Sequence, residues 1–130
     1  MATVTTKLTV SSSDLTSQIL SLSLSKAITA SHTTGLARTK VGQTAVHASA
    51  ALLYTADDYA ATAYVYIKNI DTTATNYVYV YDDTTSGDPV ILKLAGGEFA
   101  FMPTNADKTL KAYGTNATSV VEWMVFGVDQ

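Results

Sequence analysis

Two runs of alternating residues stand out in the middle of the chain, AYVYIKNID at residues 63–71 and NYVYVYD at residues 76–82. Neighbouring side chains of a strand point to opposite faces of its sheet, so this alternation predicts two β-strands. The aliphatic positions should face a hydrophobic core; they are Val65, Ile67, Val78 and Val80. The tyrosines should line the opposite face; they are Tyr64, Tyr66, Tyr77, Tyr79 and Tyr81.

A strand face that meets water usually carries Lys, Glu or Thr, so a face of tyrosines indicates that something covers it. A second sheet or a long loop of the same chain is one such cover. A second subunit is another, because tyrosine is enriched at protein interfaces. A sugar is the third, although the Asn, Asp and Arg side chains that usually complete a sugar site are not placed here by the sequence. The five tyrosines are therefore candidate interface residues.

Further strands follow from the spacing of turn residues. Segments rich in Gly, Pro, Asn and Asp recur about every ten residues, which is typical of an antiparallel β-sandwich. We expect an all-β, jelly-roll-like sandwich of one domain over residues 1–130, with residues 1–14 as an extended arm. Residues 45–53 fit either a strand or one helical turn. The other expected strands are residues 3–11, 20–24, 36–41, 90–94, 98–102, 109–113 and 119–128.

The segment from Leu92 to Pro103 reads as a tight hairpin around Gly96 and Gly97, with glycine supplying positive φ. Pro103 ends the second strand, because proline cannot donate to the ladder. The apolar residues of both strands are then expected in the core; they are Ile91, Leu92, Leu94, Phe99, Phe101 and Met102.

The composition restricts the partners. Hydrophobic residues make up 47% of the chain and charged residues only 15%, against roughly 25% charged residues in typical domains. The net charge is -3 without a basic patch, which argues against nucleic acid as a partner. No apolar stretch approaches the roughly 20 residues that span a bilayer, so we expect no membrane partner. The absence of cysteine excludes disulfides and thiol catalysis.

Catalytic and metal-binding patterns are weak. His32 and His47 have no acid at ligand spacing. The acidic run that starts at Asp82 and Asp83 and ends at Asp88 offers oxygens to a calcium ion, but it lacks the distal glutamate of an EF-hand loop. We therefore expect a protein that is not an enzyme and has no cofactor.

Three segments carry a resemblance to a known class of protein: YVYIKNID at 64–71, ILKLAGGEFAFMP at 91–103 and VEWMVF at 121–126. Together they resemble small β-rich virion proteins of tailed bacteriophages. The resemblance covers roughly residues 60–128 and transfers no catalytic residue. It implies a jelly-roll-like sandwich that serves as a capsid decoration, or cement, protein, or else as a tail or fibre component.

The resemblance and the composition lead to one functional expectation and one alternative. The expectation is a capsid decoration protein on the virion surface, made in the host cytoplasm. Its partners would be copies of itself, most simply in a trimer, and the major capsid protein or other virion proteins. The alternative is a tail or fibre component with a β-module that binds a carbohydrate or a receptor. Tyrosines sealed between subunits would favour the first, and tyrosines in an open groove would favour the second.

Overall fold

The computed structural model describes residues 1–15, 17–42 and 50–130, and this part of the chain contains strands but no helix. The all-β, antiparallel fold expected from the sequence is therefore confirmed. The strands are β1 Ala2–Ser12, β2 Leu20–Ala30, β3 His32–Thr33, β4 Ala37–Lys40, β5 Ala51–Tyr54, β6 Tyr59–Asn69, β7 Val78–Asp82, β8 Val90–Leu94, β9 Phe99–Asn105, β10 Leu110–Gly114 and β11 Val120–Asp129.

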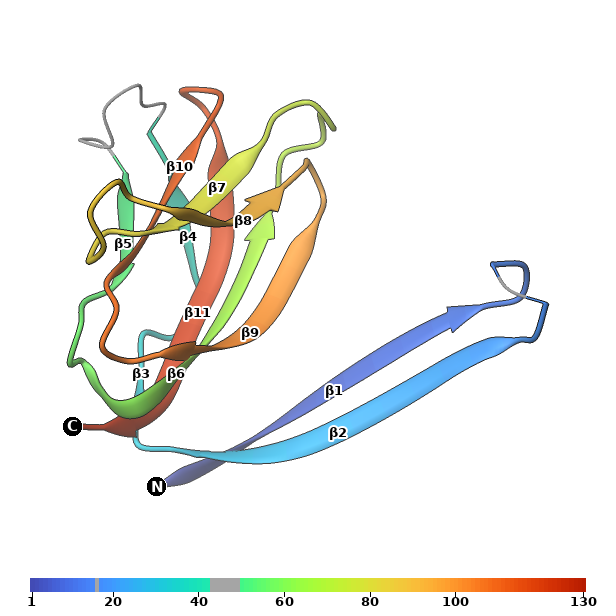
Figure 1. Cartoon of the computed structure of the whole chain (residues 1–130), viewed down its shortest axis with the longest axis horizontal. Helices are drawn as coiled ribbons and strands as arrows, with labels where there is room; N and C mark the ends of the chain where they lie inside the picture. The colour runs from blue at the N-terminus through green and yellow to red at the C-terminus, as the bar shows by residue number, and fades with distance from the viewer. Residues whose placement is uncertain (16, 43–49) are drawn as a thin grey trace.

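The molecule has two visibly different parts, a sandwich of two sheets and a long two-stranded ribbon that projects away from it (Figure 1). One sheet of the sandwich has the strand order β5-β10-β7-β8. The other has the order β3-β11-β6-β9, and β4 also pairs with β11. Strands β1 and β2 form the projecting ribbon.

The sandwich has the topology of a jelly roll. The antiparallel pairs β7·β8, β6·β9, β5·β10 and β4·β11 are nested in the sequence, and successive pairs alternate between the two sheets. A long hairpin with its tip at residues 83–89, rolled up on itself, produces this arrangement. The pairs β6·β11 and β7·β10 then join the nested pairs within each sheet.

The core lies between the two sheets and matches the expected aliphatic positions. Val65, Ile67, Val78 and Val80 have an exposed fraction of 0%. Burying a side chain of this size contributes roughly 1.5–3 kcal/mol to stability. Trp123 packs against the same cluster, and its indole N–H donates to Thr39 Oγ1 at 2.9 Å, so a polar atom at the margin of the core has a partner.

The hairpin expected around Gly96 and Gly97 is wrong, and so is the expected end of its second strand at Pro103, because β9 continues to Asn105. β8 pairs with β7 and β9 pairs with β6, so residues 95–98 form a turn that crosses from one sheet to the other. The two glycines remain necessary for different reasons. Gly97 has a φ of 84°. A Cβ on Gly96 would lie 2.3 Å from the carbonyl oxygen of Thr73, because a neighbouring loop passes directly over this turn.

The core expected in β8 and β9 is only partly correct. Leu94 is buried, and Leu92 and Met102 pack against the core. Ile91, Phe99 and Phe101 are exposed instead. In β9 the inward positions belong to Ala100 and Met102, so the two phenylalanines point to the outer face of the sheet, where Phe101 is paired with Tyr66.

Asn69, at the end of β6, ties this crossing region together. Its side chain is fully buried, and its amide donates to the carbonyl oxygens of Asn76 and Leu94 at 2.7 and 3.2 Å. The amide oxygen accepts from the N–H of Asp71. One side chain thus joins the end of β6, the following loop and the last residue of β8.

Residues 1–14 were expected to form an extended arm, and the structure extends that feature to residues 2–30. β1 and β2 pair without a break through eleven register positions, from Ala2 with Ala30 to Ser12 with Leu20. We call residues 2–30 the arm. The expectation of a strand or helical turn at residues 45–53 falls largely outside the described residues, which resume at residue 50 just before β5.

Candidate assembly interface

The arm has one apolar face and one polar face along its whole length. Alternate residues of a strand share a face, and register partners on β1 and β2 lie on the same side. Leu8 is paired with Leu24, and Val10 with Leu22. The apolar face consists of Ala2, Val4, Leu8, Val10, Leu20, Leu22, Leu24, Ile28 and Ala30, with Thr6, Ser12 and Lys26 between them. Apart from Lys7 and Ala27, the opposite face carries only Thr and Ser.

The base of the arm is seated on the sandwich. Ile28 and Ala30 are buried in a small cluster with Phe126 of β11, and Val4, Tyr64 and Met124 pack around it. The N–H of Ser31 donates to the carbonyl oxygen of Gly127 at 2.9 Å. The apolar face of the arm and the outer face of the β11-β6-β9 sheet are therefore already in contact at this point.

Further out, the same apolar face is uncovered. Leu8 and Leu24, which face each other across the hairpin, are 50% and 56% exposed, and Val10 and Leu22 are both 40% exposed. We call these four residues the distal arm face. Their clustering distinguishes them from the isolated apolar side chains of an ordinary protein surface, because contiguous exposed apolar patches mark interaction sites.

The second uncovered apolar surface lies on the outside of the β11-β6-β9 sheet. We call it the outer aromatic patch; its residues are Tyr64, Tyr66, Phe99, Phe101 and Phe126, of which Phe126 is buried and forms the inner edge at the base of the arm. The rings of Tyr64, Phe101 and Phe126 stack on one another with centroids 5.5–6.3 Å apart. Phe99 is 65% exposed and Phe101 is 42% exposed. The stacking holds these three rings of the patch against one another.

Polar contacts hold the edge of the patch. The hydroxyl of Tyr66 donates to Glu122 Oε1 at 3.0 Å, and Arg38 Nη2 lies 3.0 Å from Glu122 Oε2. The hydrogen bonds from Tyr66 and Arg38 lower the pKa of the Glu122 carboxyl. Tyr66 thus presents its ring within the patch while its polar end is satisfied at the rim.

The distal arm face and the outer aromatic patch diverge from the seated base and enclose an open groove of about 590 Å³. Leu8 and Leu24 line it from the arm, and Tyr66, Phe99, Phe101 and Phe126 line it from the sandwich. Figure 1 shows the arm leaving the sandwich at an angle, with its tip far from the sheets. We call this space the groove.

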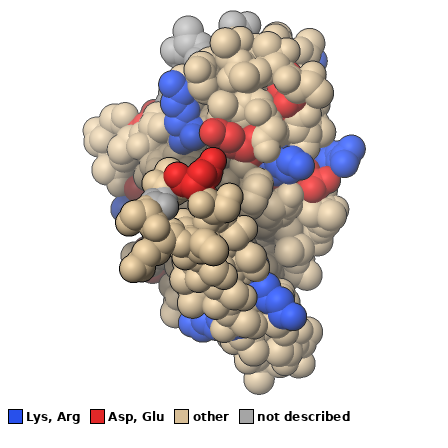
Figure 2. Space-filling model, turned by 90° about the vertical axis from the view of Figure 1, so that its right-hand side faces the viewer, with Lys and Arg blue, Asp and Glu red and all other residues tan. Residues whose placement is uncertain are grey.

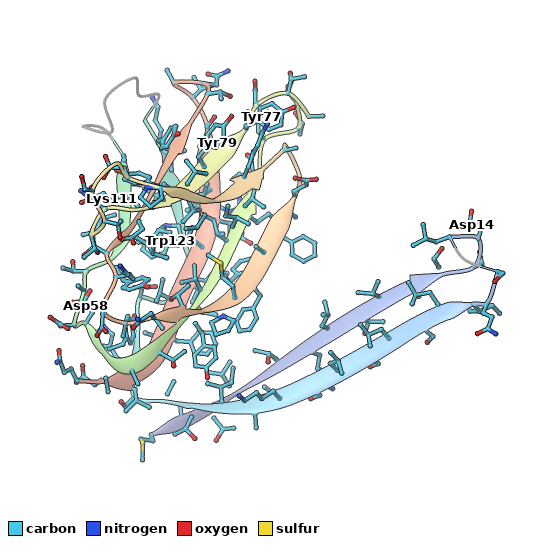
Figure 3. The ribbon with its side chains drawn as sticks, in the orientation of Figure 1. Asp14, Asp58, Tyr77, Tyr79, Lys111 and Trp123 are labelled. Atoms are coloured by element: carbon cyan, nitrogen blue, oxygen red, sulfur yellow. The ribbon has the colours of Figure 1, made fainter. Side chains whose placement is uncertain are left out.

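The five tyrosines predicted as one face are divided between two sheets, which corrects that prediction. Tyr64 and Tyr66 belong to β6 and face the groove side, whereas Tyr77, Tyr79 and Tyr81 lie on or beside β7 in the opposite sheet. Figure 3 shows Tyr77 and Tyr79 on the sandwich, well away from the tip of the arm at Asp14. Alternation identified the strands correctly, but it does not reveal which sheet a strand joins.

The β7 tyrosines form an aromatic row of their own. The rings of Tyr79 and Tyr113 stack with centroids 5.1 Å apart, and Lys93 Nζ lies 3.9 Å from the centroid of the Tyr77 ring. Tyr81 is fully buried and meets Tyr113 edge-on at 5.7 Å. Tyr77 and Tyr79 are thus available at the surface as expected of interface residues, and Tyr81 is not.

Sequence reasoning missed three of the five residues of the outer aromatic patch, Phe99, Phe101 and Phe126, and the whole distal arm face. The sequence analysis places Phe99 and Phe101 in the core together with the other apolar residues of the two strands joined at Gly96 and Gly97. The run LSLSLS at 20–25 did signal one apolar face. Nothing in that pattern states whether another layer covers the face.

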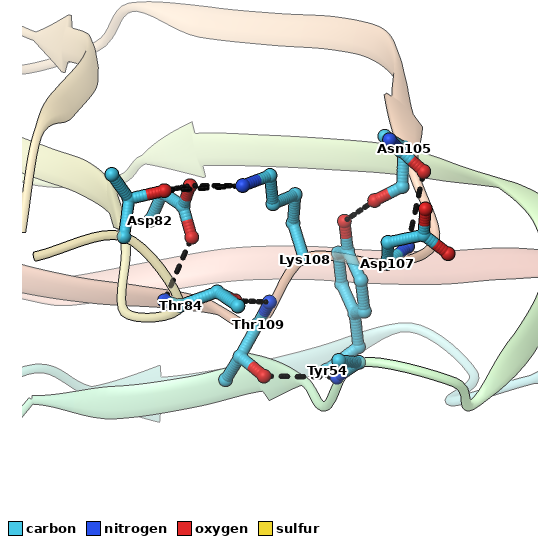
Figure 4. Close-up of polar contacts among 9 residues, drawn as sticks. Tyr54, Asp82, Thr84, Asn105, Asp107, Lys108 and Thr109 are labelled. Atoms are coloured by element: carbon cyan, nitrogen blue, oxygen red, sulfur yellow. Dashed lines mark hydrogen bonds and ion pairs between the residues drawn. The ribbon is translucent and has the colours of Figure 1, made fainter.

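Two of the acidic residues considered as calcium ligands, Asp82 and Asp83, are paired with lysines, and Figure 4 shows the contacts of Asp82 with Lys108 and Thr84. Lys108 Nζ lies 3.2 Å from Asp82 Oδ2, and Lys111 lies 2.6 Å from Asp83. Burial would raise the pKa of Asp82, but hydrogen bonds from Thr85, the Thr84 N–H and Lys108 outweigh it and lower this pKa to about 2. Within the described residues, no three His, Cys, Asp or Glu side chains gather in a way that could hold a metal.

The two histidines are not brought together with a catalytic group in the described residues. His32 is exposed, and its Nδ1 lies 3.9 Å from Oδ1 of Asp129, the last residue of β11. Its ring meets that of Tyr59 edge-on at 5.2 Å. His47 lies outside the described residues.

No helix with the length and apolar character needed to cross a membrane occurs in residues 1–15, 17–42 and 50–130.

Comparison with known proteins gives one weak likeness. No family model matches the chain, and no curated protein matches it. A solved structure described as "Bacillus endospore appendages form a novel family of disulfide-linked pili" has 12% sequence identity and a TM-score of 0.49, covering 98% of this chain and 89% of that one. A likeness at this level carries no argument about function.

Proposed function

We propose that this chain is a structural virion protein that works by packing against copies of itself and against other virion proteins, specifically as a capsid decoration (cement) protein. The observation that carries the proposal is the distal arm face, an apolar surface held away from the sandwich that contains the chain's own core. A neighbouring subunit that covers this face removes its apolar side chains from water, which gives the projecting arm a role in assembly.

The energetics support assembly. Covering a Leu, Val or Phe side chain that is now exposed contributes roughly 1.5–3 kcal/mol when burial is complete. The distal arm face and the outer aromatic patch together present several such side chains. The opposite arm face, mostly Thr and Ser, remains solvated when the apolar face is covered. The arm therefore suits a subunit interface in which one face is buried and the other meets water.

The virion setting is supported by the resemblance of residues 64–71, 91–103 and 121–126 to phage virion proteins and by the jelly-roll topology. Jelly rolls occur in viral capsid and lectin domains, although a fold alone does not determine a function. In this proposal the chain is located on the capsid surface, and its partners are copies of itself, in a trimer, and the major capsid protein. It uses no nucleic acid, membrane or cofactor and is not an enzyme.

Two measurements test the proposal. Sedimentation equilibrium at micromolar concentration should give the mass of a trimer, and the purified protein should co-sediment with phage heads that have been emptied of DNA. A monomeric mass would contradict self-assembly. If the protein is oligomeric but does not co-sediment with the heads, self-assembly is supported and the capsid role is contradicted.

A second function has its own observation, the row formed by Tyr77, Tyr79 and Tyr113 with Lys93 over the Tyr77 ring. Flat rings with an adjacent cation suit a carbohydrate face, and such a site would fit a tail or fibre component. Titration with oligosaccharides, followed by tyrosine fluorescence or NMR, should then detect binding that Tyr79→Ala abolishes. Absence of binding to a broad glycan array would remove this alternative.

A further inference from the structure

We propose that the distal arm face of one copy packs on the outer aromatic patch of a second copy, so that each copy both donates an arm and receives one. This rests on the proposed function only in requiring that the chain associates with itself. It adds which two surfaces meet.

The first argument is that the chain already makes this contact on a small scale. At the base of the arm, Val4, Ile28 and Ala30 of the apolar face pack on Phe126, Tyr64 and Met124 of the outer sheet face. The distal arm face continues the first surface beyond the Thr6 and Lys26 pair, and Phe99, Phe101 and Tyr66 continue the second. Contact between copies would therefore extend a pairing of surfaces that is present within one copy.

The second argument is that the chain's own arm leaves both surfaces uncovered. The groove of about 590 Å³ separates Leu8 and Leu24 from Phe99 and Phe101. Leu22 and Val10 lie nearer the tip and do not line the groove. The seated base fixes the direction of the arm, so its outer half is presented to a neighbour, and the patch is open to a neighbour's arm.

The third argument is electrostatic. Residues 1–30 contain two lysines and one aspartate, which gives +1, whereas residues 31–130 contain six Lys or Arg and ten Asp or Glu, which gives -4. Two sandwiches repel each other, but an arm and a sandwich attract. Figure 2, seen from the side to which the arm points, shows charged side chains concentrated over the sandwich.

Two charged residues are placed to help this attraction. Lys26 shares the apolar face of the arm, and within the described residues it forms no ion pair. Glu98 is exposed directly before Phe99 of the patch. Lys68 is paired with Phe99 on the same outer face, so Lys26 is attracted only where Glu98 lies nearer to it than Lys68, within the roughly 8–10 Å over which charges interact at physiological salt.

The symmetry of the assembly follows from the use of two different surfaces. A contact between unlike surfaces is heterologous, and repeated contacts of this kind close into a ring when the rotation between copies allows it. A ring of three, in which every copy gives one arm and receives one, agrees with the trimer proposed above. Two contacts per copy also compensate for the modest area of a single hairpin, since specific interfaces bury about 1,200–2,000 Å².

Cysteine cross-linking tests which surfaces meet, and the chain suits it because it contains no cysteine. A Leu22→Cys chain and a Phe99→Cys chain would be co-expressed with tags of different size and treated with a short bismaleimide. We expect a cross-linked heterodimer of the two chains. Both side chains are exposed in the single copy, so neither substitution should disturb the fold.

The matched control replaces Leu22→Cys with Ser23→Cys, which lies on the opposite face of the arm at the neighbouring position. This pair should give no heterodimer. Cross-linking of Leu22→Cys to itself would show arm packed against arm, and cross-linking of Phe99→Cys to itself would show patch against patch. Either result as the dominant product would overturn the inference.

Complementation provides an independent measurement by sedimentation. Leu24→Asp removes a competent arm, and Phe101→Asp removes a competent patch. Each variant alone should be monomeric, and their mixture should form heterodimers through the one intact arm and the one intact patch. If Phe101→Asp leaves the assembly unchanged, the patch is not the acceptor and the inference fails.

The two proposals fail in different ways. If the unaltered chain is oligomeric but the Leu22→Cys and Phe99→Cys chains give no cross-linked heterodimer, the pairing of surfaces is refuted and the structural function stands. An unaltered chain that is monomeric at every accessible concentration refutes self-assembly itself. Circular dichroism of each variant confirms that its fold is retained before either result is interpreted.

Discussion

The arm and the sandwich are built from the same kind of antiparallel strand with the same alternation, yet they end in opposite situations. In β7, Val78 and Val80 are completely covered by the facing sheet. In β2, Leu22 and Leu24 occupy equivalent alternate positions, and about half of each side chain is exposed. The two sequences differ little in pattern. The difference is that β7 has a second layer above it and the outer half of β2 has none.

This comparison shows that alternation identifies a face but does not provide its cover. In the sandwich, residues distant in the sequence provide it, through the nested pairs of the jelly roll. In the arm, cover ends where the base leaves Phe126. A substitution in the sandwich should therefore act on folding, and a substitution in the distal arm should act on assembly. Four experiments test this distinction.

The largest effect is expected at Gly96. Gly96→Val would drive a side chain into the backbone of Thr73, whose carbonyl oxygen lies 2.3 Å from the Cβ position and cannot rotate away. We expect a loss of about 3 kcal/mol or more, at or above the usual range for overpacking, measured by urea denaturation. Gly96→Ala should also destabilise clearly, because the clash begins at Cβ.

The control for Gly96 is Ser86→Ala, an exposed position in the turn between β7 and β8. Thr84 in the same turn is unsuitable, because its hydroxyl accepts the N–H of Thr109 at 2.6 Å. Equal stability of the Gly96→Val and Ser86→Ala proteins would mean that the crossing turn at residues 95–98 is misplaced.

The second effect concerns Asn69. Asn69→Leu keeps the approximate volume but leaves the carbonyl oxygens of Asn76 and Leu94 without their amide donor. Unsatisfied buried groups destabilise by about 1–3 kcal/mol each. The bond to Leu94 is buried but the bond to Asn76 is only partly buried, so we expect a total loss of about 2–3 kcal/mol in thermal or urea unfolding. Asn69→Asp should also be destabilising, since a carboxylate cannot donate. A fully stable Asn69→Leu protein would contradict the role of Asn69 as the tie between β6 and β8.

The third effect depends on pH. The pKa of Asp82 is lowered to about 2 in the folded protein, against about 3.9 in an unfolded chain. The unfolded state therefore takes up a proton first as the pH falls, and the stability that the ionised carboxylate contributes is lost between about pH 4 and pH 2. We expect the free energy of unfolding to fall less steeply across this window in Asp82→Asn than in the unaltered protein.

The residual slope in Asp82→Asn has its own sources, because hydrogen bonds also lower the pKa values of Asp71 and Glu122. Urea titrations at closely spaced pH values would measure both slopes. An identical slope in the two proteins between pH 4 and pH 2 would show that the contacts of Asp82 with Thr85 and Lys108 add no stability.

The smallest effect on folding, and the most direct test of the comparison, pairs two substitutions by threonine. Val80→Thr buries a hydroxyl in the core and should lower stability by about 1–3 kcal/mol. Leu24→Thr lies on an exposed surface and should change it by less than about 0.5 kcal/mol. Sedimentation should give the reverse order, with assembly weakened mainly by Leu24→Thr. A large loss of monomer stability in Leu24→Thr would mean that the distal arm is part of the folded core.

The sequence was informative wherever burial follows from local alternation. The strands around Val65, Ile67, Val78 and Val80 and their inward positions could be predicted because each strand alternates between aliphatic and tyrosine residues. The tyrosine face could not be assembled correctly, since the assignment of β6 and β7 to different sheets depends on their pairing with β9, β11, β8 and β10. These contacts leave no trace in local pattern.

Two further features escaped prediction for related reasons. Gly96 and Gly97 fit a hairpin and a crossing between sheets equally well, because both need a sharp turn with positive φ. In β9, Phe99, Ala100, Phe101 and Met102 are all apolar, so no contrast indicates which pair faces the core. The outer aromatic patch therefore became visible only once β9 was paired with β6.

The seating of the arm has a consequence for the order in which the protein is made. Val4 and Ile28 leave the ribosome first, but their seat includes Phe126 and Met124, near the end of the chain. At synthesis rates of about 5–20 residues per second, roughly 5–20 s pass before that seat exists. A hairpin forms in microseconds but is at best marginally stable on its own in water, so during this interval the arm lacks the contact that seats it. Its threonine and serine face keeps one side of the arm hydrated until Met124 and Phe126 have been made.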